Sequence, residues 1–469
     1  MTTSWRMRAV LAILELSLAA GYASRPDGAA RTATSMSAAR GSTASAPEAR
    51  GVQAGASAAR DSGDVLADAL GAARAQHADE VAAGRAAFPL PASLAPWRFD
   101  ALSFASPFGT ESGSSSGGVC ATRLPLITSA ECESLIAEAS AAMAGGQTSR
   151  FTYTAGSRLG EVHASTLPCA SRWLSRALPE RFWPLLGQSF GRDPARLVAY
   201  DCLIVRYSAT SGGVRQPVHR DGALLTVNVA LSDPSAFEGG GTWFEPSRQV
   251  ARLGRGHALA HSSEVRHAGH RLLTGERWVL VLFALCDNEP QIARRLAELA
   301  AEAKRDGRPE HALRLFAAAT EIEPLDHELH YSLGALHSEA GDEQAARAAF
   351  EHAVELYQHC PKPHVALGAI AVAADETAAA LSHFDEARAR AADEEEGSWW
   401  EAAVNSALCC QQLAEAEAEA GCAERPWRAR LPADVARLRQ ALVVAPGDER
   451  LLGLLARMEA AVEGGARVS

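Results

Sequence analysis

The sequence predicts an α+β protein of two or three domains, in which a domain of antiparallel strands precedes an all-α domain of helical repeats. Three observations support this prediction. The chain has 469 residues, which is more than one ordinary core holds. Strand-like segments follow one another between residues 197 and 287 without intervening helices, which is typical of a barrel or a sandwich. Beyond residue 291 every segment has a helical pattern, and residue types recur at a spacing of 34.

Residues 1–24 have the layout of a signal or targeting segment. Arg6 and Arg8 precede an apolar stretch that ends in small residues, although Glu15 interrupts it. Residues 25–95 are rich in Ala, Ser and Gly, and we expect this region to be disordered. The leader favours the secretory pathway or an organelle over the cytoplasm, with a plain disordered tail as the alternative. No other segment has the run of about 18 apolar residues that a membrane span needs.

We place the strand domain at residues 96–290. A helix is expected near its start, because Thr128 and Glu131 form a T-x-x-E capping box ahead of an apolar stripe. The strand-like segments are LVAYDCLIVRYS, ALLTVNVALS, GGTWFE, GHALAHS and RWVLVLFAL. Gly, Pro and Ser turns separate them, so the strands are expected to pair in antiparallel fashion.

Residues 291–469 are expected to form repeats of a helix-turn-helix unit. The residues that recur at intervals of 34 are Ala312, Ala346 and Ala380; Phe316, Phe350 and Phe384; and Ala319, Ala353 and Ala387. This period, with small residues where helices touch and one large aromatic per unit, is the tetratricopeptide pattern. Concave helical repeats commonly bind extended peptides, so a peptide or protein partner is expected.

The charge and the cysteines argue against several classes of protein. A formal net charge of −11 argues against a nucleic acid partner, since phosphate backbones are bound by clustered Lys and Arg. The nine cysteines include no C-x-x-C pair, which indicates free thiols rather than a zinc site or a disulfide scaffold. One or two disulfides are compatible with a secreted protein.

A candidate metal site begins with His219 and Asp221, two residues apart in the segment HRDGALLTVNVAL. Side chains at this spacing in an extended segment project to one face, so both reach one ion. A polar turn before a strand is the plain alternative. A third ligand has to come from a distant strand, and the candidates are His257, His261, His267 and His270. We favour His267, because it lies just before a Gly-containing turn and the last apolar strand.

Two His and one carboxylate on one face of an ion leave three adjacent positions open, which is the arrangement of non-heme Fe(II) oxygenases. Arg277 follows His267 by ten residues and enters the last strand. Its guanidinium offers a bidentate fork for the carboxylate of a chelating oxo acid.

The motif H-x-D, followed by EGGGTWF, H-x-G and an Arg ten residues past the His, resembles the Fe(II)- and 2-oxoglutarate-dependent dioxygenases of the prolyl 4-hydroxylase and lysyl hydroxylase class. The resemblance covers roughly residues 125–287. It implies a double-stranded β-helix, or jelly roll, with His219, Asp221 and His267 on iron. It also implies that Arg277 binds the distal carboxylate of 2-oxoglutarate, that O2 is the second cosubstrate, and that L-ascorbate is an auxiliary reductant.

The resemblance assigns two further residues to the cosubstrate pocket. Asn228 lies nine residues past the first His, and Tyr207 ends the strand CLIVRYS. Asn228 also fits the residue pattern, because it shares the polar face of a strand whose other face is Leu and Val. His261 and His270 are interpreted as surface residues or as neighbours of the ligands. Arg271, which with Arg277 has the R-x5-R spacing of nucleic-acid dealkylating oxygenases, is left without a role.

The function expected on this basis is hydroxylation of a prolyl or lysyl side chain in a protein or peptide, with release of succinate and CO2. The repeats are expected to present part of the substrate. One alternative is a small-molecule oxygenase whose repeats serve assembly. The other is a non-catalytic repeat scaffold with a vestigial oxygenase domain, which the presence of all four chemical residues argues against.

Overall fold

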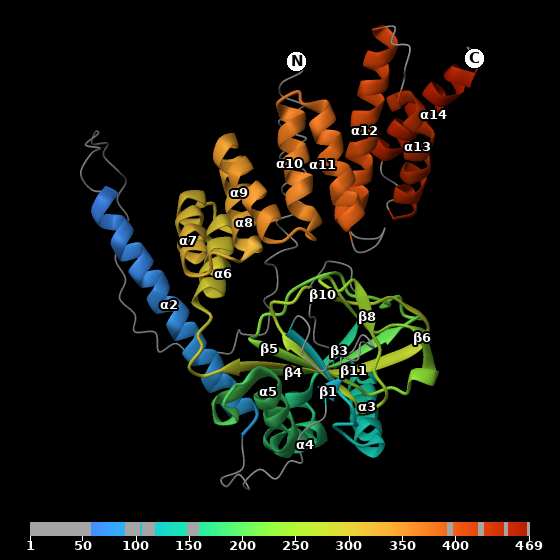
Figure 1. The fold of residues 1–469 in the computed structure, drawn as a ribbon. Helices are drawn as coiled ribbons and strands as arrows, with labels where there is room; N and C mark the ends of the chain where they lie inside the picture. The colour runs from blue at the N-terminus through green and yellow to red at the C-terminus, as the bar shows by residue number, and fades with distance from the viewer. Residues whose placement is uncertain are drawn as a thin grey trace, which may run out of the picture.

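The protein consists of a strand-rich domain and a solenoid of helices that arches above it (Figure 1). The structure is a computed structural model that describes residues 58–89, 104–105, 118–147, 159–391, 397–420, 426–444 and 449–466. The predicted order, an antiparallel sheet region followed by a helical repeat region, is confirmed.

The strands form two antiparallel sheets. The large sheet has the order β1-β2-β9-β5-β11-β4-β3, with β6 paired to β11. Its strands are β1 (Phe104–Ala105), β2 (Val119–Thr122), β3 (Gly160–His163), β4 (Leu197–Ser208), β5 (Leu225–Ala230), β6 (Phe237–Gly239), β9 (Ala258–Ser262) and β11 (Leu272–Cys286). The small sheet has the order β10-β7-β8 and consists of β7 (Thr242–Phe244), β8 (Gln249–Ala251) and β10 (His267–Gly269). The sheets pack together where Phe244 and Ala251 meet Val119 and Leu259.

Strand β5 is buried on both faces, and each face has its own chemistry. Val227 and Val229 belong to the main hydrophobic core together with Leu280 of β11. Thr226 and Asn228 lie on the opposite face, because side chains alternate along a strand. The polar face of β5 therefore points into the space where the candidate site lies.

Helices cover the apolar face of the large sheet. They are α3 (Ser129–Ala144), α4 (Pro168–Ala177) and α5 (Trp183–Phe190). The predicted capping box starts α3: the Thr128 hydroxyl accepts from the Glu131 amide, and the Thr128 amide donates to the Glu131 carboxylate at 2.7 Å. Leu135, Leu174 and Leu186 from these helices fill the core beneath the sheet.

The solenoid is built from antiparallel helix pairs. Its helices are α6 (Ile292–Arg305), α7 (Pro309–Ile322), α8 (His327–Glu339), α9 (Glu343–Leu356), α10 (Pro361–Ala373), α11 (Thr377–Arg390), α12 (Gly397–Glu419), α13 (Pro426–Val444) and α14 (Glu449–Ala466). A Cβ added to Gly334 would lie 2.9 Å from the Phe350 ring, and one added to Gly368 would lie 2.6 Å from the Phe384 ring. The same glycine-on-aromatic contact thus recurs after 34 residues, which is the physical reason for the repeat in the sequence.

A long helix, α2 (Ala58–Ala87), corrects the expectation of disorder for this part of residues 25–95. Residues 25–57 and 90–95 lie outside the described residues. Ala69 of α2 packs against α6 and α7, and Val81 packs against β4. The Glu80 carboxylate forms an ion pair with Arg295, which is fully buried. Alanine is the best helix former, so the composition that suggested disorder instead forms a helix once both domains cover its apolar positions.

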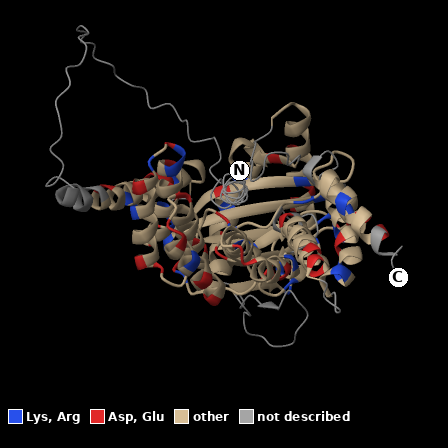
Figure 2. Cartoon of the chain, turned by 90° about the horizontal axis from the view of Figure 1, so that it is seen from above, with Lys and Arg blue, Asp and Glu red and all other residues tan. Residues whose placement is uncertain are grey.

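The predicted leader, residues 1–24, lies outside the described residues. No helix in the described part of the chain is long and apolar enough to cross a membrane. Each cysteine that the structure describes is a free thiol. Lys and Arg are interspersed with Asp and Glu in the view of Figure 2, and the exclusion of a nucleic acid partner stays a prediction.

Candidate metal centre

Three predicted side chains converge between the two sheets. The segment that contains His219 pairs with β10, since the His219 amide donates to the His267 carbonyl at 2.9 Å and the reverse bond measures 3.0 Å. The His219 Nε2 lies 3.4 Å from Asp221 Oδ1, and the His267 Nε2 lies 3.6 Å from Asp221 Oδ2. The three ligand atoms all lie within 4.8 Å of one another, which is close enough to share one metal ion.

The backbone fixes how both imidazoles present their nitrogens. The Nδ1 of His219 lies 2.8 Å from the Pro217 carbonyl, and the Nδ1 of His267 lies 2.9 Å from the Val265 carbonyl. A carbonyl only accepts, so Nδ1 carries the proton in both rings. Both Nε2 atoms, which lie on the Asp221 side, are therefore unprotonated and available to a metal ion.

The carboxylate is held from behind by hydroxyl groups. Thr226 donates its hydroxyl to Asp221 Oδ2 at 2.5 Å, and the Ser263 hydroxyl lies 3.0 Å from that of Thr226. Burial raises the pKa of the Asp221 carboxyl, but its interactions with His267 and His219 outweigh this effect and hold the pKa well below its usual range. Burial lowers the pKa of His267 to about 3. An ionised carboxylate beside a neutral imidazole is the protonation state that metal binding needs.

His261 is a neighbour of the site rather than a surface residue. It is fully buried, its ring centroid lies 4.5 Å from that of His267, and its Nε2 lies 3.3 Å from the Asn228 amide nitrogen. Burial lowers the pKa of His261, which favours the neutral ring. The signal in the sequence is the alternation along β9, which places His261 on the same face as Leu259. The structure shows that Leu259 lines the adjoining cavity.

Arg277 and Tyr207 lie opposite each other on β11 and β4. The Arg277 guanidinium is 5.0 Å from the centre of the Tyr207 ring, and the Tyr207 hydroxyl donates to the Gln216 side chain at 3.2 Å. Arg277 is only 9 % exposed, and burial lowers its pKa. No carboxylate in the described part of the chain forms an ion pair with it. A buried cation without a counter-charge is costly, which is the signature of a site for an anion.

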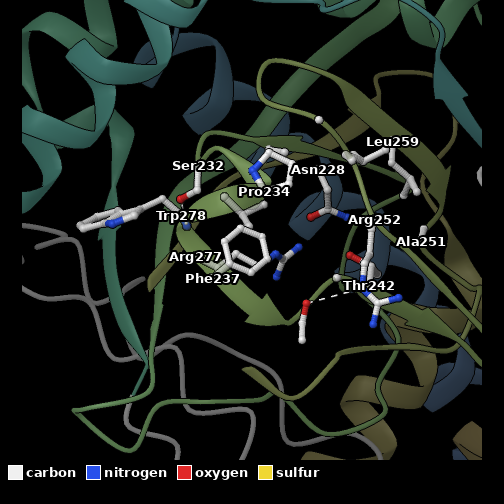
Figure 3. Close-up of a pocket in the computed structure, with 16 residues that line it drawn as sticks. Asn228, Ser232, Pro234, Phe237, Thr242, Ala251, Arg252, Leu259, Arg277 and Trp278 are labelled. Atoms are coloured by element: carbon white, nitrogen blue, oxygen red, sulfur yellow. Dashed lines mark hydrogen bonds between the residues drawn. The ribbon is translucent and has the colours of Figure 1, made fainter. Parts of the chain in front are cut away.

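Two adjoining cavities meet at Arg277 and Asn228. One, of about 40 Å³, is lined by all three candidate ligands and by Tyr207. The other, of about 310 Å³, extends toward Phe237 and Trp278, as Figure 3 shows. Every residue that lines these cavities belongs to the strand domain.

The glycine run before β7 forms a tight bend. Gly239, Gly240 and Gly241 all have positive φ values, of 76°, 61° and 105°. A Cβ on Gly240 would lie 3.0 Å from Arg277 Cδ, so the absence of a side chain leaves room for the arginine. Arg271, by contrast, is exposed. The structure thus brings together His219, Asp221, His267, Arg277, Asn228 and Tyr207, whose roles stay predictions.

No family model matches the chain. No curated protein matches it either. Among solved structures, the MamA protein is 15% identical over 37% of this chain and 86% of its own, with a TM-score of 0.29. YrrB, described as a TPR protein with an unusual peptide-binding site, is 18% identical over 38% and 80%, with a TM-score of 0.29. SnoN, a non-heme alpha-ketoglutarate-dependent epimerase from nogalamycin biosynthesis, is 17% identical over 36% and 77%, with a TM-score of 0.30. Likeness at this level supports no conclusion about function, which depends on the residues of the site.

Proposed function

We propose that the chain is an Fe(II)- and 2-oxoglutarate-dependent oxygenase that hydroxylates a prolyl or lysyl side chain of a peptide or protein. One observation carries this proposal. A buried guanidinium without an ionic partner, that of Arg277, and three convergent metal-ligating side chains line the same small cavity. A metal ion would balance the charge of the Asp221 carboxylate, and a carboxylate of a dianionic oxo acid would balance that of the Arg277 guanidinium.

The three side chains fit iron. Two neutral imidazoles and one ionised carboxylate on one side of an ion form the facial set of non-heme Fe(II) oxygenases. His219, Asp221 and His267 would hold the metal, with both imidazoles oriented by backbone carbonyls. Iron with O2 and 2-oxoglutarate supplies the oxidation of a C–H bond to an alcohol, with succinate and CO2 as the other products.

The other side chains bind, orient and exclude water. Arg277 pairs through its fork with the distal carboxylate of 2-oxoglutarate, while Tyr207 keeps the guanidinium plane in place. Asn228, on β5 beside His261, donates to the cosubstrate. Val279, Val281 and Phe283 line the cavity with apolar surface, which keeps water from the reacting atoms.

The strand order supports a jelly roll as the fold of this domain. Along the chain, β4 and β5 belong to the large sheet, the intervening segment of His219 bridges to the small one, and β7 and β8 are again in the small sheet. Strands β9, β10 and β11 then alternate between the large, small and large sheets. We assign the oxygenase domain to residues 96–290 and the repeats to residues 291–469, with α2 packed on both.

The test is incubation of the full chain with Fe(II), 2-oxoglutarate, ascorbate and a library of Pro- and Lys-containing peptides. We expect a mass gain of one oxygen on a peptide together with succinate. His267→Ala should abolish both products, whereas His257→Ala, outside the ligand set, should keep them. Succinate production that is unchanged in His267→Ala contradicts the metal assignment, and succinate without peptide hydroxylation in the entire library contradicts the substrate assignment.

A further inference from the structure

An arginine accompanies each of the two segments that bear the candidate ligands. Arg220 stands between His219 and Asp221, and Arg266 stands directly before His267. Neighbouring side chains in an extended segment point to opposite faces, so both arginines leave the segments on the side away from the ligands. The two segments are themselves joined by the paired hydrogen bonds between His219 and His267.

Both arginines end on the first turn of α8 in the repeat domain. Arg266 Nη1 bonds Glu328 Oε1, and its Nε donates to Glu245 Oε2 at 2.8 Å. Arg220 Nη1 lies 2.9 Å from Asp326 Oδ2, and its Nε lies 3.5 Å from Glu328 Oε2. Each oxygen of the Glu328 carboxylate thus faces a different ligand-bearing segment.

This network is buried. Arg266 is 4% exposed, Glu245 is 1% exposed and Glu328 is 8% exposed. Burial raises the pKa of the Glu328 carboxyl, but the Arg220, Arg266 and Lys362 charges outweigh it and keep the pKa well below its usual range. Buried ion pairs contribute little net stability compared with apolar contacts, so their main effect is to fix geometry. Loss of one partner leaves an uncompensated charge that moves its neighbours.

We propose that Glu328 is a positioning residue for the metal centre, which ties the two ligand-bearing segments together from the repeat domain. The inference rests on the metal site of the proposed function and adds a dependence of that site on α8. Glu328 contacts the ligand-bearing segments through Arg220 and Arg266, and the two cavities described above are lined by residues of the strand domain.

The experiment measures the dissociation constant of Co(II), a stable stand-in for Fe(II), on the full metal-free chain. Glu328→Gln keeps the shape of the side chain and removes its charge. We expect at least a tenfold weaker metal affinity, about the lower end of the effect of losing support around metal ligands. Glu339→Gln is the matched control, because Glu339 bonds Lys304 inside the repeats at 2.5 Å and is remote from the ligand segments.

A second variant covers the case in which Glu328→Gln does not fold. Asp326 is the N-cap of α8, and Asp326→Asn retains that cap while it removes the charge that faces Arg220. We expect about tenfold weaker Co(II) binding, the lower end of the range for indirect support of ligands. An affinity equal to wild type in whichever variants fold, as judged by circular dichroism, overturns the inference.

His267→Ala separates this inference from the proposed function. If His267→Ala loses Co(II) and Glu328→Gln keeps it, the metal site stands and the role of Glu328 is refuted. If His267→Ala binds Co(II) as wild type does, the metal site is refuted and the inference with it. A lower melting temperature of metal-free Glu328→Gln at unchanged Co(II) affinity marks a merely structural contact and also overturns it.

Discussion

Replacement of Arg277 by methionine should make the protein more stable and also insensitive to 2-oxoglutarate. Arg277 is 9% exposed, and no described carboxylate forms an ion pair with its guanidinium. Exchange of buried ionic groups for apolar ones of similar volume stabilises by about 1–4 kcal/mol. Loss of the stacking on Tyr207 offsets about 0.5–2 kcal/mol of this gain. A net gain of about 1–2 kcal/mol raises the Tm by roughly 2–8 °C for a domain of this size.

The assay is thermal unfolding of the Co(II)-loaded protein without oxygen, at increasing 2-oxoglutarate. A ligand at 100 times its Kd stabilises the wild-type fold by about 2.7 kcal/mol, whereas Arg277→Met should show no shift. Arg277→Lys retains the charge and loses the fork, so it should need more 2-oxoglutarate to give the same shift.

Two results would refute the reasoning about Arg277. An equal response of wild type and Arg277→Met to 2-oxoglutarate would mean that another residue binds the distal carboxylate. A clearly lower Tm of Arg277→Met without ligand would mean that the guanidinium stabilises the fold itself, in which case its burial is no sign of an anion site.

Three further predictions test other parts of the structure. Thr226→Val removes the hydroxyl that donates to Asp221, so Co(II) affinity should fall about tenfold in a titration, and an unchanged affinity would contradict the role of that bond. Burial raises the pKa of Glu401 from 4.5 to about 7, so stability falls as pH rises through this window. Glu401→Gln should therefore raise the free energy of unfolding by roughly 3 kcal/mol above about pH 7 and leave it unchanged below about pH 4. An equal change at both pH values, in denaturant titrations, would contradict this prediction. A Cβ on Gly84 would lie 2.3 Å from a β4 carbonyl, whereas one on Gly71 would meet nothing within 4 Å. In thermal unfolding, Gly84→Ala should therefore lower the Tm of the protein, and Gly71→Ala should not. An undocked α2 would instead make both changes neutral or stabilising.

Local periodicity explains which features the sequence predicted. The alternation along β5 separates Thr226 and Asn228 from Val227 and Val229, and the structure has the same two faces. The interval of 34 reflects one recurring contact of a glycine with a phenylalanine ring. Two of the candidate ligands, His219 and Asp221, are two residues apart in one segment, and the third, His267, comes from the segment that precedes the last strand. The pairing of these segments brings the three ligand atoms together.

The features that the sequence did not predict depend on contacts between distant residues. Arg220 and Asp326 are 106 positions apart, and Glu80 and Arg295 are 215 positions apart. Neither pair leaves a local pattern, because a charge on a helix is by default a solvated charge. For the same reason the Ala-rich stretch gave no sign that α2 docks between the domains.

The α8 contact points to a supporting role for the repeats, as an alternative to the expected presentation of a long substrate. They were expected to present part of a long substrate, which predicts that a damaged repeat contact impairs long peptides and spares short ones. In the structure α8 touches the ligand-bearing segments on the side away from the metal, and the described cavities are lined by the strand domain alone. Under the proposed function, Glu328→Gln should therefore reduce hydroxylation of a short and a long peptide by the same factor, measured at subsaturating Fe(II). A loss confined to the long peptide would restore the presenting role and place a substrate surface on the repeats.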